Sequence, residues 1–287
     1  MIRAEFWVTQ LFNGISYGAL LFLLAGGLTL IFGMMRIVTM THGSHYVLGC
    51  YVAITVLARS GSYVLALLGG ALVVAVLGLI EWEAFLKGLR GGELAQVLTT
   101  MGLALIVQDL ALVIWGGDPY NLKVPGLLSG KFQLGAFFFP VYRVFIIAVA
   151  GAVALILWLV VERTRVGAMM RAAVDDAEMA RGVGIDVARI SLGIFALGAA
   201  LAAVAGVVAG GFLSVYPGAD FEILSYAFVV VIVGGMGSLR GALIGSLLVG
   251  LLDNFGKALV PELSYFTLFA PMAVILAVRP TGLFGRA

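Results

Sequence analysis

Residues 162–189 read ERTRVGAMMRAAVDDAEMARGVGIDVAR and carry ten charged side chains. The whole chain of 287 residues has only 17 basic and 15 acidic side chains. The 18 residues before this stretch, Val144–Val161, are uncharged, and so are the 30 residues after it, Ile190–Ala219. Crossing a bilayer takes about 20 apolar residues, so each flanking run is of membrane length. The stretch is therefore expected to be a loop in water between two spans, and its short, arginine-rich character predicts the cytoplasmic side.

The composition of the whole chain agrees with a membrane protein. Hydrophobic residues make up 62% of it and charged residues 11%, and the mean hydropathy is +1.14. An average soluble domain carries about 25% charged residues, so a water-soluble fold is excluded. No basic run with interleaved aromatic residues occurs, which leaves nucleic-acid binding without support. We expect an all-α, polytopic helical bundle that forms one transmembrane domain over residues 1–287, with the cytoplasmic loop at 162–189.

The charge-free runs predict about eight to ten membrane segments, some of them short or broken. They lie near residues 8–33, 37–58, 62–81, 94–115, 141–161, 190–213, 223–237, 241–256 and 263–278. The first run is too long for the apolar part of a signal peptide, about 7–15 residues, so we expect it to be retained as a span. Counting back from the cytoplasmic loop places residues 116–140 and 216–220 outside, and the N-terminal side outside as well. Lys87, Arg90, Arg240 and the tail 279–287 come out inside. A break at Thr41-His42-Gly43 could instead make the second segment re-entrant and invert the count.

Glycine is abundant, with 39 residues, and many of them recur at helical spacing. Small residues four apart let helices approach closely in lipid, so most of these glycines are expected to be packing contacts. Examples are Gly14/Gly18, Gly206/Gly210 and Gly237/Gly241/Gly245. A short internal echo pairs residues 14–20 with residues 193–199, which fits either a true repeat or a chance match. The glycine-interrupted segments 223–235 and 241–252 are typical of channels and transporters.

Within the charged loop, residues 174–184 predict a helix of about two turns. Asp175 and Asp176 suit its start, Arg181 suits its end, and Gly182 and Gly184 stop it. Its apolar side would consist of Ala177, Met179, Ala180 and Val183. Such a helix could lie on the membrane surface, but interfacial helices usually combine a basic face with bulky apolar residues. This pattern instead favours insertion into a groove of a partner protein.

Polar side chains interrupt the apolar segments at several places. Intramembrane polar groups are costly and usually face the bundle interior or a water-filled pathway. The densest set is Thr39, Thr41, His42, Ser44 and His45, which could line a pathway or could satisfy backbone opened at Gly43. The adjacent pair Ser44–His45 also suggests the hypothesis of an intramembrane serine protease, although adjacency alone gives no nucleophile–base geometry. The isolated groups are Asn13, Gln96, Gln108, Asp109 and Asp253.

Asp109 is the costliest of the isolated groups because it is a carboxylate within an expected span. It could act as an ion relay in a secondary transporter, or it could pair with an arginine or lie near the outer surface, and the pairing reading is favoured.

Several motifs of catalytic and nucleotide-binding proteins do not occur in the sequence. There is no G-x-x-x-x-G-K-[ST] stretch, no H-E-x-x-H and no paired-cysteine metal pattern. The single cysteine, Cys50, lies in an apolar run and is expected to be inert packing. We therefore expect no catalytic residues, no metal, no cofactor and no nucleotide site in this chain.

Three blocks of sequence resemble the permeases of branched-chain amino acid ABC transporters. The charged loop matches their coupling-loop signature over residues 163–172 and 175–187. The resemblance extends through residues 33–38, 41–43 and 48–51, and it resumes at 233–242, so it covers nearly the whole chain in order. The chain departs from the family where Thr39-Met40-Thr41-His42-Gly43 replaces Asn-Phe-Ala-His-Gly, and where Ser44 stands in place of a frequent acid.

The resemblance implies a permease subunit of a binding-protein-dependent importer in a bacterial inner membrane. Its partners would be a second, similar permease, two cytoplasmic ATPase subunits and a periplasmic binding protein that delivers an amino acid or a similar small carboxylate or amide. The ATPase contact is assigned to Asp175, Asp176, Ala177, Glu178, Met179, Arg181 and Gly184. The translocation pathway is assigned to Asn13, Thr41, His42, Ser44 and Gln108. The alternative is an ion-coupled secondary transporter or channel for small solutes that uses Asp109.

Overall fold

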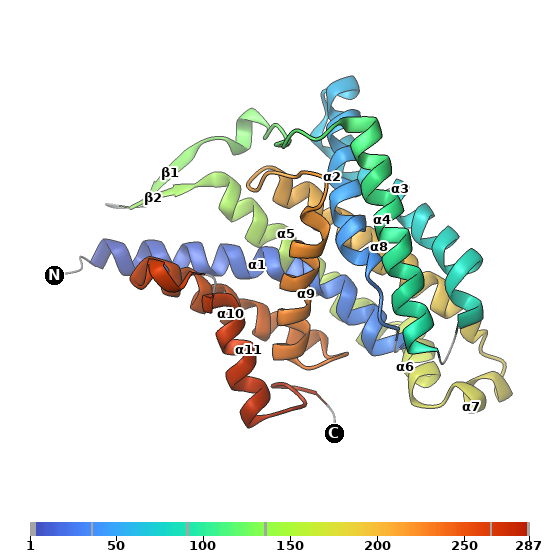
Figure 1. Ribbon diagram of the computed structural model, residues 1–287. Coiled ribbons are helices and arrows are strands. Elements are labelled where there is room, and N and C mark those ends of the chain that lie inside the picture. The colour runs from blue at the N-terminus through green and yellow to red at the C-terminus, as the bar shows by residue number, and fades with distance from the viewer. Residues whose placement is uncertain (1–3, 36, 90–91, 135–136, 265, 286–287) are drawn as a thin grey trace.

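The structure, a computed structural model, is an all-helical bundle with one small β-hairpin (Figure 1). It describes residues 4–35, 37–89, 92–134, 137–264 and 266–285. The expected cytoplasmic position of Arg90 therefore lies outside the described residues. The elements are α1 (Ala4–Met35), α2 (Thr41–Ser60), α3 (Tyr63–Glu81), η1 (Trp82–Leu86), η2 (Lys87–Leu89), α4 (Glu93–Trp115), η3 (Gly126–Leu128), β1 (Lys131–Leu134), β2 (Phe137–Pro140), α5 (Val141–Arg163), α6 (Arg165–Asp175), α7 (Ala177–Gly182), α8 (Val187–Gly210), α9 (Ala219–Gly234), α10 (Leu239–Leu259), η4 (Pro261–Leu263) and α11 (Phe266–Val278).

Among the described residues, six helices are long and apolar enough to cross a bilayer. They are α1, α3 with its extension to Leu89, α4, α5, α8 and α10. In lipid every backbone N–H and C=O must be paired within the protein, which long helices achieve by themselves. The predicted fold class, a polytopic all-α membrane bundle, is confirmed.

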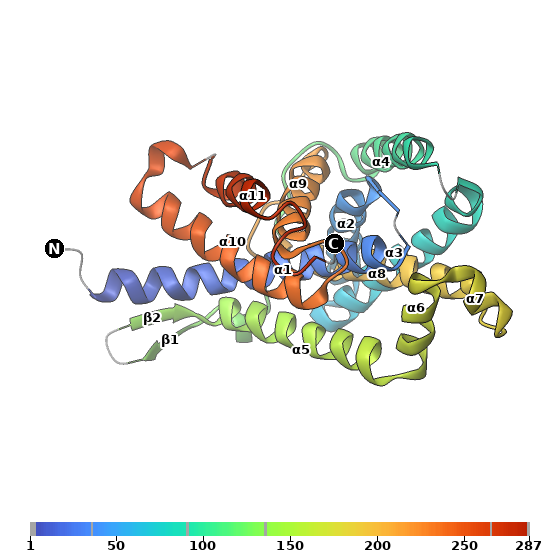
Figure 2. The same ribbon diagram turned by 90° about the horizontal axis from the view of Figure 1, so that it is seen from below.

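The elements that leave the bundle gather at two opposite ends. One end carries α6 and α7 and is called the α6–α7 end. The other carries the β-hairpin and is called the hairpin end (Figure 2). At the hairpin end, β1 and β2 pair antiparallel, and the Phe139 ring packs on Phe12 of α1. Tyr120 pairs with Val215 there, so the loop after α4 is fastened to the loop after α8.

The helix bounds agree closely with the predicted segments, with two corrections. The helix expected to begin at residue 223 begins at Ala219, so Asp220 is a buried residue of its first turn and not part of an exposed loop. The segment expected at 241–256 begins at Leu239 and continues to Leu259. It continues because the buried carboxyl group of Asp253 bonds to Lys257, one turn further along α10, and to Thr267 of α11.

The second segment is broken just before the predicted place. Residues 37–39 have no helical structure, Met40 caps the helix, and α2 begins at Thr41. Two contacts place this start part-way along the bundle. His42 reaches the Leu24 carbonyl in the middle of α1, and Gly43 packs on the Asp220 backbone. α2 then runs to Ser60 near the hairpin end, where α1 also begins. The break therefore does not invert the predicted alternation of the following segments between the two sides of the membrane.

Helices α1 and α8 form the centre of the bundle. They are the most buried of the six long helices, and they meet where Gly27 of α1 contacts Gly198 of α8. α10 packs antiparallel along α1, with Gly14 against Leu251, and Gly33 packs against Gly237 in the turn before α10. These close backbone approaches are the small-residue packing that the sequence predicted.

The second half of the chain repeats the arrangement of the first half in the opposite direction. In each half a long helix is followed by a break, a helix that starts part-way along the bundle, a long helix and a fourth helix, giving α1–α4 and α8–α11. α3 packs on α8 just as α10 packs on α1, and α2 contacts α4 just as α9 contacts α11. α1 ends at the α6–α7 end, whereas α8 begins there. The echo between residues 14–20 and 193–199 falls on the two corresponding helices, which favours a true repeat.

Candidate functional site

The α6–α7 segment is fastened to the ends of the two spans that it connects. Thr164 caps α6 by accepting a hydrogen bond from the Gly167 N–H, and the Arg171 guanidinium donates to the Val161 carbonyl at the end of α5. On the other side, the Ile185 N–H donates to the Ala180 carbonyl, and Asp186 caps α8. The α6–α7 segment is therefore bonded directly to the end of α5 and to the start of α8.

α7 is shorter than the predicted helix, and its start is fixed by one side chain. The Asp176 carboxylate accepts hydrogen bonds from the N–H groups of Glu178 and Met179, at 3.0 and 2.9 Å. The helix covers Ala177–Gly182 and not 174–184, because this cap sets its first residue. Asp175 instead ends α6, a helix of 11 residues where the sequence predicts only a loop. Gly184 follows α7 with φ +88°, a left-handed conformation suited to glycine.

The predicted apolar side of α7 is divided between the interior and the surface. Ala180 is buried, whereas Met179 and Val183 expose 66% and 73% of their surfaces. Asp175, Asp176, Glu178 and Arg181 are exposed as well. Two large apolar side chains thus stand among charged ones at the end of the bundle, in a region too polar to lie within a bilayer.

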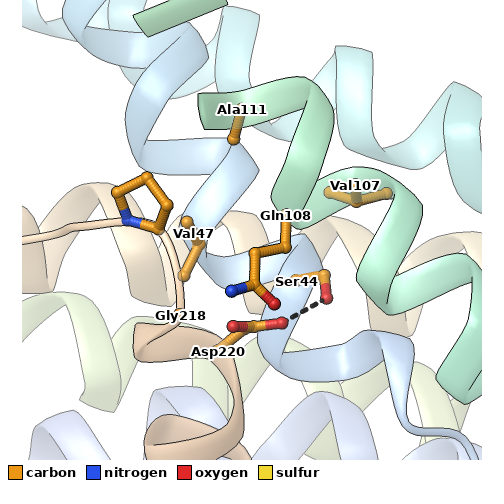
Figure 3. A pocket seen from close by; sticks show the side chains of 8 residues that line it. Ser44, Val47, Val107, Gln108, Ala111, Gly218 and Asp220 are labelled. Carbon is orange, nitrogen blue, oxygen red and sulfur yellow. Dashed lines mark hydrogen bonds between the residues drawn. The ribbon is translucent and has the colours of Figure 1, made fainter. Parts of the chain in front are cut away.

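A small pocket lies where α2, α4 and the start of α9 meet (Figure 3). Its polar lining consists of Ser44 from α2, Gln108 from α4 and Asp220 from α9. The rest is apolar or backbone: Val47, Val107, Ala111, Pro217 and Gly218. Two of the predicted pathway residues, Ser44 and Gln108, which are 64 positions apart in the chain, therefore share one pocket.

Asp220 is the charged group of this pocket. Ser44 Oγ donates a hydrogen bond of 3.0 Å to Asp220 Oδ2. The Oδ1 atom is buried and has no hydrogen-bond partner, although the N–H groups of Asp220 and Phe221 lie near the carboxyl group. Gly43, one residue before Ser44, makes this approach of α2 to α9 possible, because a methyl group there would overlap the Asp220 carbonyl oxygen.

The neighbouring polar residues of α2 point to other helices. His42 Nε2 lies 2.8 Å from the Leu24 carbonyl of α1. Thr41 Oγ1 donates a hydrogen bond to Glu81 Oε2 of α3, and His45 Nε2 lies 3.1 Å from the same oxygen. These side chains join α2 to its neighbours and are not among the residues that line the pocket.

The positions of Ser44 and His45 remove the basis for the protease reading. The Ser44 hydroxyl bonds to Asp220, while the His45 ring lies beside Glu81. A serine nucleophile needs a base within hydrogen-bond reach, and here the two side chains have different partners.

The remaining predicted polar residues are separate from the pocket. Asn13 lies half-buried on α1 next to Gly14, near the hairpin end, and is not among the pocket's lining residues. The Gln96 amide nitrogen donates to the Leu89 carbonyl at the α6–α7 end. Asp109 is exposed on α4, and within the described part of the chain no ion pair includes it, so the favoured pairing with an arginine is not seen.

Two buried acids were missed as site residues by sequence reasoning. Glu81 stands at the polar edge of an apolar run, and the sequence predicts it as the end of a span. In the structure the π-helical turn η1 continues the helix, and Glu81 is buried against Thr41 and His45 of α2. Asp220 comes shortly after Pro217-Gly218, and the sequence predicts it as part of an outer loop. The sequence does hold a signal for Asp220, because an acid shortly before a long apolar run suits the first turn of a helix.

Comparisons with known proteins agree with this architecture. A family model described as the permease component of branched-chain amino acid transport systems matches residues 10–277. The high-affinity branched-chain amino acid transport system permease protein BraD of Pseudomonas aeruginosa is 30% identical, and the match covers 98% of this chain and 96% of BraD. Its counterpart LivH of Escherichia coli K12 is 29% identical, with the same two coverages. The ribose import permease protein RbsC of the same strain is 26% identical over 94% of this chain and 84% of RbsC.

A solved structure also has a similar fold. PsaBC from Streptococcus pneumoniae, in complex with Fab, superposes with a TM-score of 0.50 at 13% sequence identity. The match covers 93% of this chain and 89% of the solved chain. At this identity the likeness concerns the fold alone.

Proposed function

Because the chain belongs to the permease family of branched-chain amino acid transport systems, we propose that it is the membrane subunit of an ATP-driven importer. The imported solute is an amino acid, branched-chain or related, or a similar small carboxylate or amide. A periplasmic binding protein delivers it, a second similar permease completes the pathway, and two cytoplasmic ATPase subunits supply the energy. The membrane is the inner membrane of a bacterium, with the α6–α7 end in the cytoplasm.

The observation that carries this proposal, beside the family membership, is the exposed apolar pair on α7. Met179 and Val183 stand out from the bundle between charged side chains, which suits insertion into a groove of a soluble partner. Asp175, Asp176, Ala177, Glu178, Arg181 and Gly184 surround them and complete the contact.

The bonds around α7 indicate how force would pass into the membrane. When the ATPase subunits close on ATP they push α7, and the Arg171–Val161 and Ile185–Ala180 bonds pass the displacement to α5 and α8. α8 packs on α1, α2 and α3, so both halves of the bundle follow. The pathway opens alternately to the two sides near Ser44 and Gln108, while Thr41 and His42 hold α2 in place and Asn13 lies nearer the hairpin end.

The test places a charge in the proposed contact. Met179→Asp combined with Val183→Asp introduces two carboxylates at exposed positions, so the chain still folds while the apolar contact is lost. Removing two such anchors typically costs enough affinity to weaken binding about a hundredfold or more. Detergent-solubilised complexes are purified through a tag on this chain, and the co-purifying ATPase subunits and their ATP hydrolysis are measured.

Leu127→Asp is the control, because Leu127 is also an exposed apolar residue but lies at the hairpin end. It should retain the ATPase subunits. If the α7 double variant also retained them at the level of the unaltered chain, α7 would not be the contact.

The ion-coupled alternative is tested with the purified chain alone in liposomes. We expect no uphill uptake under an imposed proton or sodium gradient, because the energy source resides in other subunits. Gradient-driven accumulation that Asp109→Asn abolishes would establish the alternative and refute the importer.

A further inference from the structure

Three acids are buried within the described part of the bundle, and they differ in their partners. Asp253 bonds to the Lys257 ammonium, and Glu81 has the His45 ring and the Thr41 hydroxyl beside it. Asp220, with 3% of its surface exposed, has the Ser44 hydroxyl at one oxygen, and no basic side chain of the described residues forms an ion pair with it. A buried carboxylate without a cation is costly, and an intramembrane acid of this kind usually has a functional role.

Asp220, with its unpartnered oxygen, lines the pocket between α2, α4 and the start of α9. The Gln108 amide points towards the Asp220 carboxyl group, and the Ser44 hydroxyl lies beside the same carboxyl group (Figure 3). Pro217 and Gly218 bring non-helical backbone to the same place, where α2 and α9 both start part-way along the bundle. Solute sites of transporters commonly form at such interrupted helices.

The lining groups indicate the class of ligand. A primary ammonium group has three N–H donors and one positive charge. The pocket offers one carboxylate oxygen without a partner, one amide and one hydroxyl, so each donor can find an acceptor and the charge can be neutralised. A metal ion fits less well, because no group of three or more His, Cys, Asp or Glu side chains able to hold one occurs among the described residues.

We propose that Asp220, with Ser44 and Gln108, binds the ammonium group of the transported solute, an inference that rests on the transport function proposed above. It narrows the solute class from small carboxylates and amides in general to solutes that carry a primary amine, such as amino acids. Asp220 is then a specificity-determining residue: a solute of the same shape without the amine leaves the carboxylate uncompensated.

The experiment measures import by the assembled importer, with its ATPase subunits and binding protein, in cells. The probes are the standard amino acids and 4-methylpentanoate, which has the side chain and carboxylate of leucine without the amine. Asp220→Asn removes the charge but keeps one oxygen to accept the Ser44 hydrogen bond, so the fold is retained. Loss of one charge-assisted contact lowers import of the amino acid by about tenfold or more. Asp220→Glu restores part of the import, and ATP hydrolysis by the purified complex verifies that each variant assembles.

Asp109→Asn is the matched control, because it removes an acid from the same region of α4, one residue beyond Gln108, but at an exposed position. It should import as the unaltered chain does. If the Asp220→Asn variant imported amino acids at the rate of the unaltered chain, the proposed ammonium site would be refuted, whereas the proposed importer function would not. If the unaltered importer took up 4-methylpentanoate and no amine-bearing solute, the inference would again fail with transport intact. Absence of any ATP-dependent uptake in an assembled complex would refute the proposed function itself.

Discussion

At the scale of single residues, the burial of a carboxylate decides how much its ion pair contributes to stability. Two ion pairs, each between residues four positions apart in the chain, differ in the burial of the acid. Lys257 and Lys87 are almost equally exposed, at 48% and 47%. Their partners differ, because Asp253 exposes 2% of its side chain whereas Glu83 exposes 56%. The lysine of the first pair therefore neutralises a carboxylate that water cannot reach.

This contrast predicts a difference in stability between two matched variants. Lys257→Met should lower the free energy of unfolding by about 2 kcal/mol, since it leaves the Asp253 carboxylate uncompensated; the value is below that of a fully buried pair because Lys257 is half exposed. Lys87→Met should change it by about 0.5 kcal/mol or less, as is usual for exposed pairs. SDS-titrated unfolding in mixed micelles, followed by tryptophan fluorescence, measures both. Equal losses in the two variants would show that the burial of Asp253 has no energetic consequence.

At the scale of elements, hydropathy alone predicted most of the helices. The segment expected at 94–115 is α4, Glu93–Trp115, and the one expected at 141–161 is α5, Val141–Arg163. Long uncharged runs leave a helix as the solution that pairs all backbone groups in lipid, so their bounds follow from composition. α6 was missed because Arg165, Arg171 and Asp175 interrupt its apolar residues, so hydropathy gives no signal there. The β-hairpin was missed because it depends on contacts such as Phe12–Phe139.

The candidate site was only partly predictable for the same reason. Ser44 and Gln108 were found because they are polar residues in apolar runs. Asp220 and Glu81 were not found, because their burial depends on neighbours from distant parts of the chain, such as Gly43 beneath Asp220.

The cap of α7 gives a prediction at this scale. Asp176→Ala removes the acceptor of the Glu178 and Met179 N–H groups and should destabilise α7 by about 1 kcal/mol. Hydrogen–deuterium exchange of the peptide covering residues 177–183 should then be about fivefold faster, because the local opening equilibrium shifts by that free energy. Asp176→Ser should retain most of the protection. Asp175→Ala, at the adjacent exposed acid, is the control, and equal acceleration by it would show that charge and not capping is responsible.

At the scale of the whole molecule, the structure has two opposite ends with different composition. Arginines and acids gather at the α6–α7 end, whereas the hairpin end presents aromatic residues and a loop with few charges. The positive-inside rule therefore assigns opposite sides of the membrane to the two ends.

Cysteine labelling in intact cells tests this assignment. Leu127→Cys should react with a membrane-impermeant maleimide added outside, whereas Met179→Cys should react only after the cells are permeabilised. The native Cys50 is fully buried, so the unaltered chain serves as an unlabelled reference. Labelling of Met179→Cys in intact cells would place α7 outside and contradict the proposed ATPase contact.

The contact between Gly27 of α1 and Gly198 of α8 has a geometrical consequence. It lies where the two most buried spans meet, one from each half of the chain. When one half turns against the other, atoms near the fulcrum travel least and those at the rims travel furthest. The His42 ring lies against Gly27, and the Asp220 pocket begins one residue beyond Gly43, so the proposed solute site lies close to the contact about which the two halves would turn. The geometry of that proposed site can then stay nearly constant while the openings at the two membrane faces widen and narrow in turn.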